Sequence, residues 1–78
     1  MPTVQELMQV AKSVQTGRLD RILQRLGTLE DGLRLHGFDE LVERLCLGRQ
    51  ALLSGVETEL QRSLAHITSK LGHLQKRN

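Results

Sequence analysis

The longest patterned stretch of the chain, residues 39–75, reads DELVERLCLGRQALLSGVETELQRSLAHITSKLGHLQ. Its aliphatic residues recur at the spacing that places side chains on one face of an α-helix, with Arg49 occupying one step. They are Leu45, Leu52, Val56, Leu60, Leu64, Ile67, Leu71 and Leu74. A single helix over this stretch would be roughly 55 Å long at about 1.5 Å per residue. We therefore expect the shorter N-terminal part of the chain to fold against it.

This helix has a weak point at Ser54-Gly55-Val56-Glu57, where a serine and a glutamate three residues later form a capping-box pattern. A break there would divide the stretch into two helices, 39–53 and 55–75. The aliphatic face nevertheless continues in register through Gly55. We therefore expect one continuous or merely bent helix over 39–75.

Two shorter helices are expected before it. Thr3 and Glu6 form a capping box for a helix over about 3–16, which Gly17 ends. A second helix over about 18–36 carries a heptad seam, typical of coiled-coil packing, and its Glu30 and Arg34 form an i,i+4 pair expected on the outer side. The seam consists of Leu19, Ile22, Leu26, Leu29 and Leu33.

The clearest turn is His36-Gly37-Phe38-Asp39. Gly37 can adopt the left-handed conformation that ends a helix, and Asp39 is a suitable N-cap for the next one. We expect Phe38 to close the end of this hairpin rather than to contact a ligand. Because the connection is short, the helices on either side should be antiparallel neighbours.

Composition supports an all-α fold. The 78 residues contain one Phe and no Trp or Tyr, and they are rich in helix-forming side chains. We predict one domain, residues 1–78, folded as a three-helix bundle or an antiparallel helical hairpin with a long C-terminal helix and a shorter N-terminal helix. An aliphatic core of this size supplies only about 3–5 kcal/mol, and oligomerisation is a common remedy.

Several classes of protein are disfavoured. Cys46 is the single cysteine, so no intramolecular disulfide can form. The chain has neither a membrane-spanning apolar run nor a signal-peptide pattern, so we expect a cytoplasmic protein. His66 and His73 are two helical turns apart, which is too far to share a metal ion. We expect Cys46 to be a buried structural thiol and the protein to have no catalytic activity, metal or cofactor.

The C-terminal end of the chain is basic, because no acidic residue follows Leu60. Its cations are Arg62, Lys70, Lys76 and Arg77. These residues are candidate contacts for an acidic partner, although cations at a helix C-terminus also stabilise the helix itself. Nucleic-acid binding is disfavoured, because the helix that would enter a DNA groove begins with the acids Asp39, Glu40 and Glu43.

The expected function is therefore non-catalytic protein binding, as an adaptor, assembly factor, chaperone or inhibitor. A small basic nucleic-acid-associated regulator, acting through the C-terminal basic end, is the alternative. If Gly17 reverses the chain, the second half of the long helix stays uncovered and exposes Leu60, Leu64, Ile67, Leu71 and Leu74. Such an apolar stripe marks an interface, and we expect a homodimer or a partner protein to cover it.

Overall fold

A computed structural model describes residues 2–76, which fold into helices with no strand in that range. The helices are α1 (Val4–Ser13), α2 (Leu19–Leu35), α3 (Asp39–Leu53) and α4 (Glu57–Lys76). The prediction of an all-α protein is confirmed. The prediction of three helices is wrong, because residues 39–75 form two helices, α3 and α4, that are separated by a turn.

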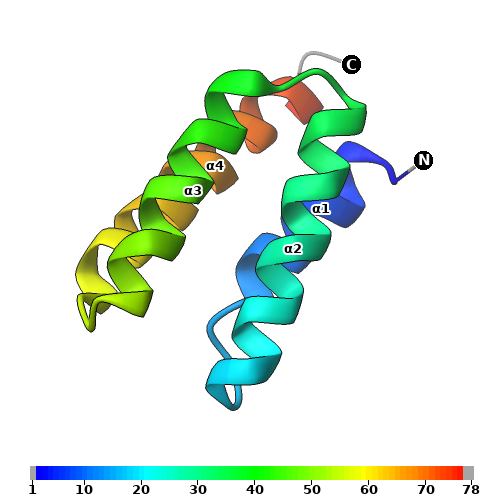
Figure 1. Ribbon diagram of the computed structural model, residues 1–78. Coiled ribbons are helices and arrows are strands. Elements are labelled where there is room, and N and C mark those ends of the chain that lie inside the picture. Colours follow the sequence, from blue (N-terminus) through cyan, green and yellow to red (C-terminus); the bar gives the residue numbers. More distant parts are fainter. Residues whose placement is uncertain (1, 77–78) are drawn as a thin grey trace.

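The four described helices run alternately up and down, so that each packs against the next around a square (Figure 1). α1 contacts α2 and α4, and α3 contacts α2 and α4. The bundle measures 38 × 18 × 18 Å. The connections between α1 and α2 and between α3 and α4 lie at the same end, which we call the distal end. None of these helices is long and apolar enough to cross a membrane.

The turn between α3 and α4 is centred on Gly55, whose φ of 87° lies in the left-handed region. Gly55 N donates to the carbonyl of Leu52 at 3.0 Å, and Val56 N donates to the carbonyl of Ala51 at 2.8 Å. This pair of bonds is the Schellman motif, which ends a helix and satisfies its last carbonyls. The expected continuous helix therefore stops at Leu53.

Burial of apolar side chains explains why the chain turns at Gly55 instead of continuing as one helix. By folding back along α3, α4 places Leu60, Leu64, Ile67 and Leu71 in the core with exposures of 1%, 4%, 0% and 0%. Burying one such side chain contributes about 1.5–3 kcal/mol, so the four contribute on the order of 6–12 kcal/mol. The turn re-forms two hydrogen bonds of its own, so its cost is much smaller. Val56, which helical spacing places on the aliphatic face, is 48% exposed.

The turn between α2 and α3 has the same construction. Gly37 has a φ of 76°, and the nitrogens of Gly37 and Phe38 donate to the carbonyls of Arg34 and Leu33, each at 3.0 Å. The predicted left-handed glycine is confirmed. The expected N-cap is wrong by one residue, because Phe38 occupies that position without a side-chain cap and Asp39 is the first residue of α3.

The end of α1 is fixed by α2. α1 stops at Ser13, three residues before the expected end, and Gly17 has a φ of 96° in the connection that follows. Arg25 on α2 reaches back to the carbonyls of Ser13 and Thr16 and to the Thr16 hydroxyl. A guanidinium thus adds a charged donor at the helix end, where the Ser13 carbonyl also accepts hydrogen bonds from the Thr16 nitrogen and hydroxyl. The chain reverses at this point, and α1 lies beside α4.

The core is aliphatic, as expected, and all four helices contribute to it. Its buried members are Leu7, Ala11, Val14, Leu26, Leu29, Leu33, Leu41, Val42, Leu45, Leu60, Leu64, Ile67 and Leu71. Two glycines allow close helix contacts. A Cβ at Gly32 would overlap Leu7, and a Cβ at Gly48 would lie 2.9 Å from the Ser63 hydroxyl oxygen. These glycines set how closely α1 approaches α2 and α4 approaches α3.

Replacing Gly55 with Ala should lower the free energy of unfolding by about 1–2 kcal/mol, because an L-residue resists the left-handed conformation. Gly27→Ala is the matched control: Gly27 lies inside α2, and a Cβ there would meet nothing within 4 Å. That substitution should stabilise the protein by about 0.4–1 kcal/mol. Urea denaturation of both variants gives the comparison, and equal effects would contradict the assigned turn.

Replacing Gly48 with Ala should destabilise the bundle by about 1–3 kcal/mol, because the added methyl group meets Ser63 across the α3–α4 contact. Removing the Ser63 side chain in Gly48→Ala/Ser63→Gly should recover part of this loss. A double-mutant cycle measured by thermal unfolding isolates the coupling between the two sites. Strictly additive effects would show that the two positions do not touch.

Candidate functional site

The aliphatic stripe expected to form an interface belongs to the core of the bundle. Leu60, Leu64, Ile67 and Leu71 are buried between α4 and its neighbours, and Leu74 is partly buried against the same cluster. The expectation that this stripe is exposed is therefore wrong. It assumed a continuous long helix, whereas the turn at Gly55 places α4 beside both α1 and α3. The stripe offers no reason to expect a dimer.

Arg62 and Lys70, two basic residues of α4, lie in different surroundings. Arg62 lies 3.7 Å from Glu59, one turn earlier on the same helix. Lys70 is exposed two turns further along, at the opposite end of the bundle from the α3–α4 turn. Lys76 is the last residue of α4, and Arg77 lies outside the described residues.

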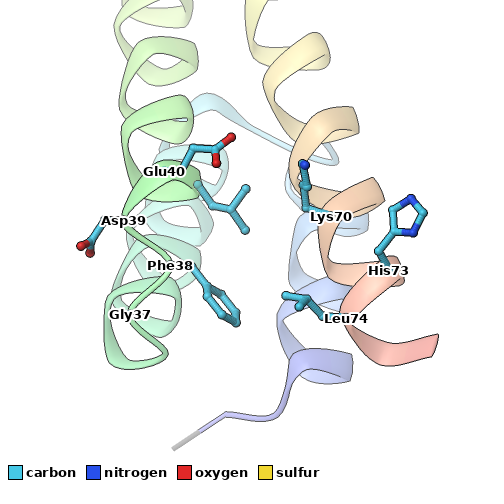
Figure 2. Close-up of a pocket in the computed structure, with 8 residues that line it drawn as sticks. Gly37, Phe38, Asp39, Glu40, Lys70, His73 and Leu74 are labelled. Atoms are coloured by element: carbon cyan, nitrogen blue, oxygen red, sulfur yellow. The ribbon is translucent and has the colours of Figure 1, made fainter. Parts of the chain in front are cut away.

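A pocket of about 510 Å³ lies between the start of α3 and the last turns of α4. We call it the end pocket. It is lined by Gly37, Phe38, Asp39, Glu40, Leu41, Lys70, His73 and Leu74. Figure 2 shows the Phe38 ring and Leu74 pointing into the space between the two helices. The structure thus brings together two predicted site residues, Lys70 and Leu74, with a phenylalanine expected only to close the hairpin.

Phe38 is held in position by its neighbours. It is partly buried against the core, and its ring stacks on His36 with a centroid distance of 5.2 Å and an interplanar angle of 16°. The His36 Nε2 atom donates a hydrogen bond to the Pro2 carbonyl oxygen at 2.5 Å. The N-terminal segment and the end of α2 therefore support the apolar wall of the pocket from behind.

The rim of the end pocket carries opposite charges on its two sides. Glu40 extends from α3 toward α4, where Lys70 lies, while Asp39 and His73 point away from the pocket (Figure 2). Among the ion pairs of residues 2–76, none joins Glu40 to Lys70. The Glu40 carboxylate instead lies 3.5 Å from His66 Nε2, close enough for electrostatic contact but not aligned as a hydrogen bond.

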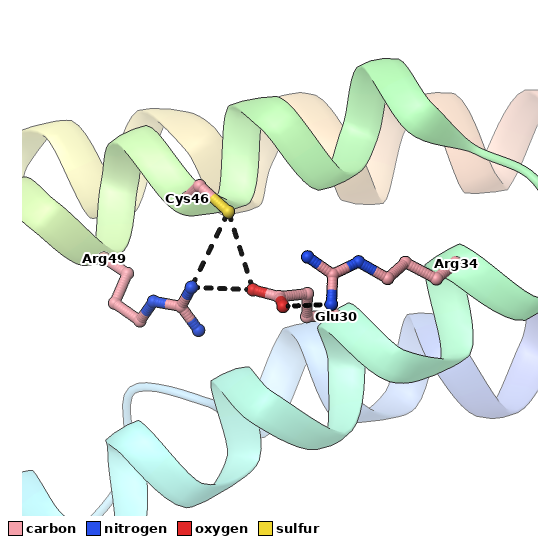
Figure 3. Close-up of polar contacts among 4 residues, drawn as sticks. All are labelled: Glu30, Arg34, Cys46 and Arg49. Atoms are coloured by element: carbon pink, nitrogen blue, oxygen red, sulfur yellow. Dashed lines mark hydrogen bonds and ion pairs between the residues drawn. The ribbon is translucent and has the colours of Figure 1, made fainter.

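A second polar group connects α2 and α3 near their middles (Figure 3). The Glu30 carboxylate is 2.8 Å from Arg49 and 2.9 Å from Arg34, and the Cys46 thiol donates to it at 3.5 Å. Glu30 was expected on the outer side of its helix, but it is only 7% exposed. Cys46 is half-buried rather than fully buried. This arrangement pairs a buried carboxylate, as a folded interior requires.

The Glu30 group shows how sequence reasoning can miss a site. The i,i+4 spacing identified Arg34 as a partner, but Arg49 and Cys46 lie on another helix. Glu30 is one residue after Leu29 and three residues before Leu33, both fully buried, so its position next to the apolar seam was the available signal. No cluster of three or more potential metal-binding side chains occurs among the described residues.

Apolar side chains also remain exposed at the distal end. Leu19 at the start of α2 is 54% exposed, Leu53 at the end of α3 is 63% exposed, and Val56 in the following turn is 48% exposed. We call these three residues the distal surface. Leu35 and Leu47 are exposed elsewhere, on α2 near its end and on the outer side of α3. Isolated exposed leucines are common on proteins, and the distal surface differs in holding three of the five large aliphatic side chains exposed among the described residues.

Comparisons with protein-family models, with curated proteins and with solved structures found no match to this chain.

Replacing Glu30 with Gln should lower the free energy of unfolding by about 1–2 kcal/mol, because it removes the charge that two guanidinium groups share. The loss is limited, since Arg34 and Arg49 can turn toward water. Glu59→Gln is the control: its exposed pair with Arg62 should contribute no more than about 0.5 kcal/mol. Chemical denaturation of both variants tests this, and equal losses would contradict a stabilising role for Glu30.

Proposed function

We propose that this chain is a non-catalytic protein-binding module, of the kind that acts as an adaptor, assembly factor, chaperone or inhibitor. The observation that carries the proposal is the distal surface. The aliphatic core is closed, with its members between 0% and 8% exposed, yet Leu19, Leu53 and Val56 stay in contact with water at one end. Side chains of this kind gain free energy when a second molecule covers them.

The size of the distal surface sets the expected strength of binding. Each of the three side chains is already about half covered, so burying the remainder contributes only about 2–5 kcal/mol. Association itself costs about 4–15 kcal/mol in lost freedom of motion. The distal surface therefore supports a weak or transient complex on its own, and a tight complex requires additional contacts.

The alternative expected from the sequence is a basic nucleic-acid-associated regulator that acts through the C-terminal basic end, and two of the four cations at that end lie near acids. Arg62 is paired with Glu59, and Lys70 lies opposite Glu40 at the rim of the end pocket. A continuous positive surface, on which phosphate contacts depend, would require cations without nearby acids. We therefore retain protein binding as the proposed function.

The proposal is tested by comparing proteins captured from an extract of the source cells by three baits: the wild type, Leu53→Glu/Val56→Glu, and the control Leu47→Glu. Leu47 is 59% exposed on α3, away from the distal end, so the control adds the same kind of charge elsewhere. A specific partner should bind the wild type and the control and be lost from the distal variant. Loss of the partner from both variants, or from neither, would contradict the binding role proposed for the distal surface.

Two further measurements identify the kind of partner. Light scattering of the wild type at high micromolar concentration shows whether a second copy of the chain is the partner. A salt titration separates apolar from phosphate contacts, because nucleic-acid binding weakens steeply between about 50 and 200 mM salt whereas an apolar interface does not. A complex that dissociates over that range would favour the nucleic-acid alternative.

A further inference from the structure

The end pocket is a second place where this bundle can bind a ligand, at the opposite end from the distal surface. Its volume of about 510 Å³ lies within the usual range for ligand sites, roughly 300–1,000 Å³. It is also too large for one aliphatic side chain to fill. Phe38, Leu41 and Leu74 supply an apolar lining, so its occupant must carry apolar groups.

The charges at the rim restrict the occupant further. An anion that binds beside Lys70 would be repelled by Glu40 on the facing helix. A cation that binds beside Glu40 would be repelled by Lys70. Neither a fatty acid nor an alkylamine is therefore favoured by the rim as a whole. The favoured ligand is neutral overall, with a positive group facing α3 and a negative group facing α4.

A peptide segment satisfies these requirements, because its side chains can place apolar and oppositely charged groups a few residues apart. We infer that the end pocket binds a partner segment in which large apolar side chains lie between a basic residue that faces Glu40 and an acidic residue that faces Lys70. This inference rests on the proposed protein-binding function, and it names the chemistry of the segment that a partner would present.

The site is built to receive such a segment with little rearrangement. Phe38 is fixed by the stacked ring of His36 and by the Gly37 turn, and Leu41 is only 6% exposed. Glu40 and Lys70, in contrast, are exposed and not paired with each other. The Glu40 carboxylate has only the 3.5 Å contact with His66, so both side chains can turn toward a charge on the ligand. Because the apolar wall is rigid and the charged side chains can move, the pocket should select ligands by their pattern of charges more than by their shape.

The test uses three labelled, end-blocked hexapeptides with the same central pair of leucines. One has a lysine and a glutamate on either side of the pair, one has two glutamates, and one has two lysines. Fluorescence anisotropy gives their affinities for the wild-type protein, and backbone amide NMR shifts locate their binding. The mixed-charge peptide should bind most tightly, with shifts at residues 37–41 and 70–74. Replacing its leucines with serine should abolish binding.

Charge reversal at the rim should change this ranking in opposite directions. Glu40→Lys makes both sides positive and should favour the two-glutamate peptide, whereas Lys70→Glu should favour the two-lysine peptide. We expect each preference to change about five-fold, since exposed ion pairs contribute modestly. Glu43→Lys is the control, because it makes the same change one turn further along α3, outside the pocket lining. It should leave the ranking unchanged.

The inference is wrong if no peptide at about 1 mM produces NMR shifts at the lining residues. It is also wrong if the order of peptide affinities does not change when the charges at positions 40 and 70 are reversed. Neither result bears on the proposed function, because the test of that function changes Leu53 and Val56 at the distal end. Conversely, a partner lost from the Leu53→Glu/Val56→Glu bait says nothing of peptides in the end pocket. The two experiments therefore distinguish failure of the pocket from failure of the protein-binding function.

Discussion

The fold depends on burial of the aliphatic face of α4. A chain of 78 residues with one aromatic residue has few large side chains with which to build a core. Leaving Leu60, Leu64, Ile67 and Leu71 in water would forfeit a large part of the available hydrophobic free energy. The turn at Gly55 prevents this loss by bringing α4 back along α3, and the reversal after α1 places α1 on the other side of α4.

Polar contacts then fix how the helices are arranged. Arg25 holds the end of α1 against α2, and Glu30 with Arg49 links α2 to α3. Close packing at Gly48 and Ser63 determines the distance between α3 and α4. Apolar contacts are not directional and allow many arrangements, whereas these contacts each require a defined geometry. They explain how a core without aromatic residues can still specify one packing.

Spacing in the sequence predicted the helical class, the turn at Gly37 and the aliphatic character of the core. It failed at Gly55 because Val56 falls in helical register with Leu52 and Leu60 by coincidence, so periodicity could not reveal the break. The local pattern was the better guide: Ser54-Gly55-Val56-Glu57 repeats the order of glycine, apolar residue and acid found in Gly37-Phe38-Asp39. One error then produced the next, since only an unbroken helix would have left Leu64 and Leu71 exposed.

The candidate site was accessible to sequence reasoning only in part. Lys70 and Leu74 were identified, but for separate reasons: one as a cation and the other as a member of an apolar stripe. Their meeting with Phe38 and Glu40 depends on α4 running antiparallel to α3, which follows from the Gly55 turn. The same turn leaves Leu53 and Val56 in water at the other end. One local conformation therefore both closes the core and creates the two surfaces to which binding is proposed.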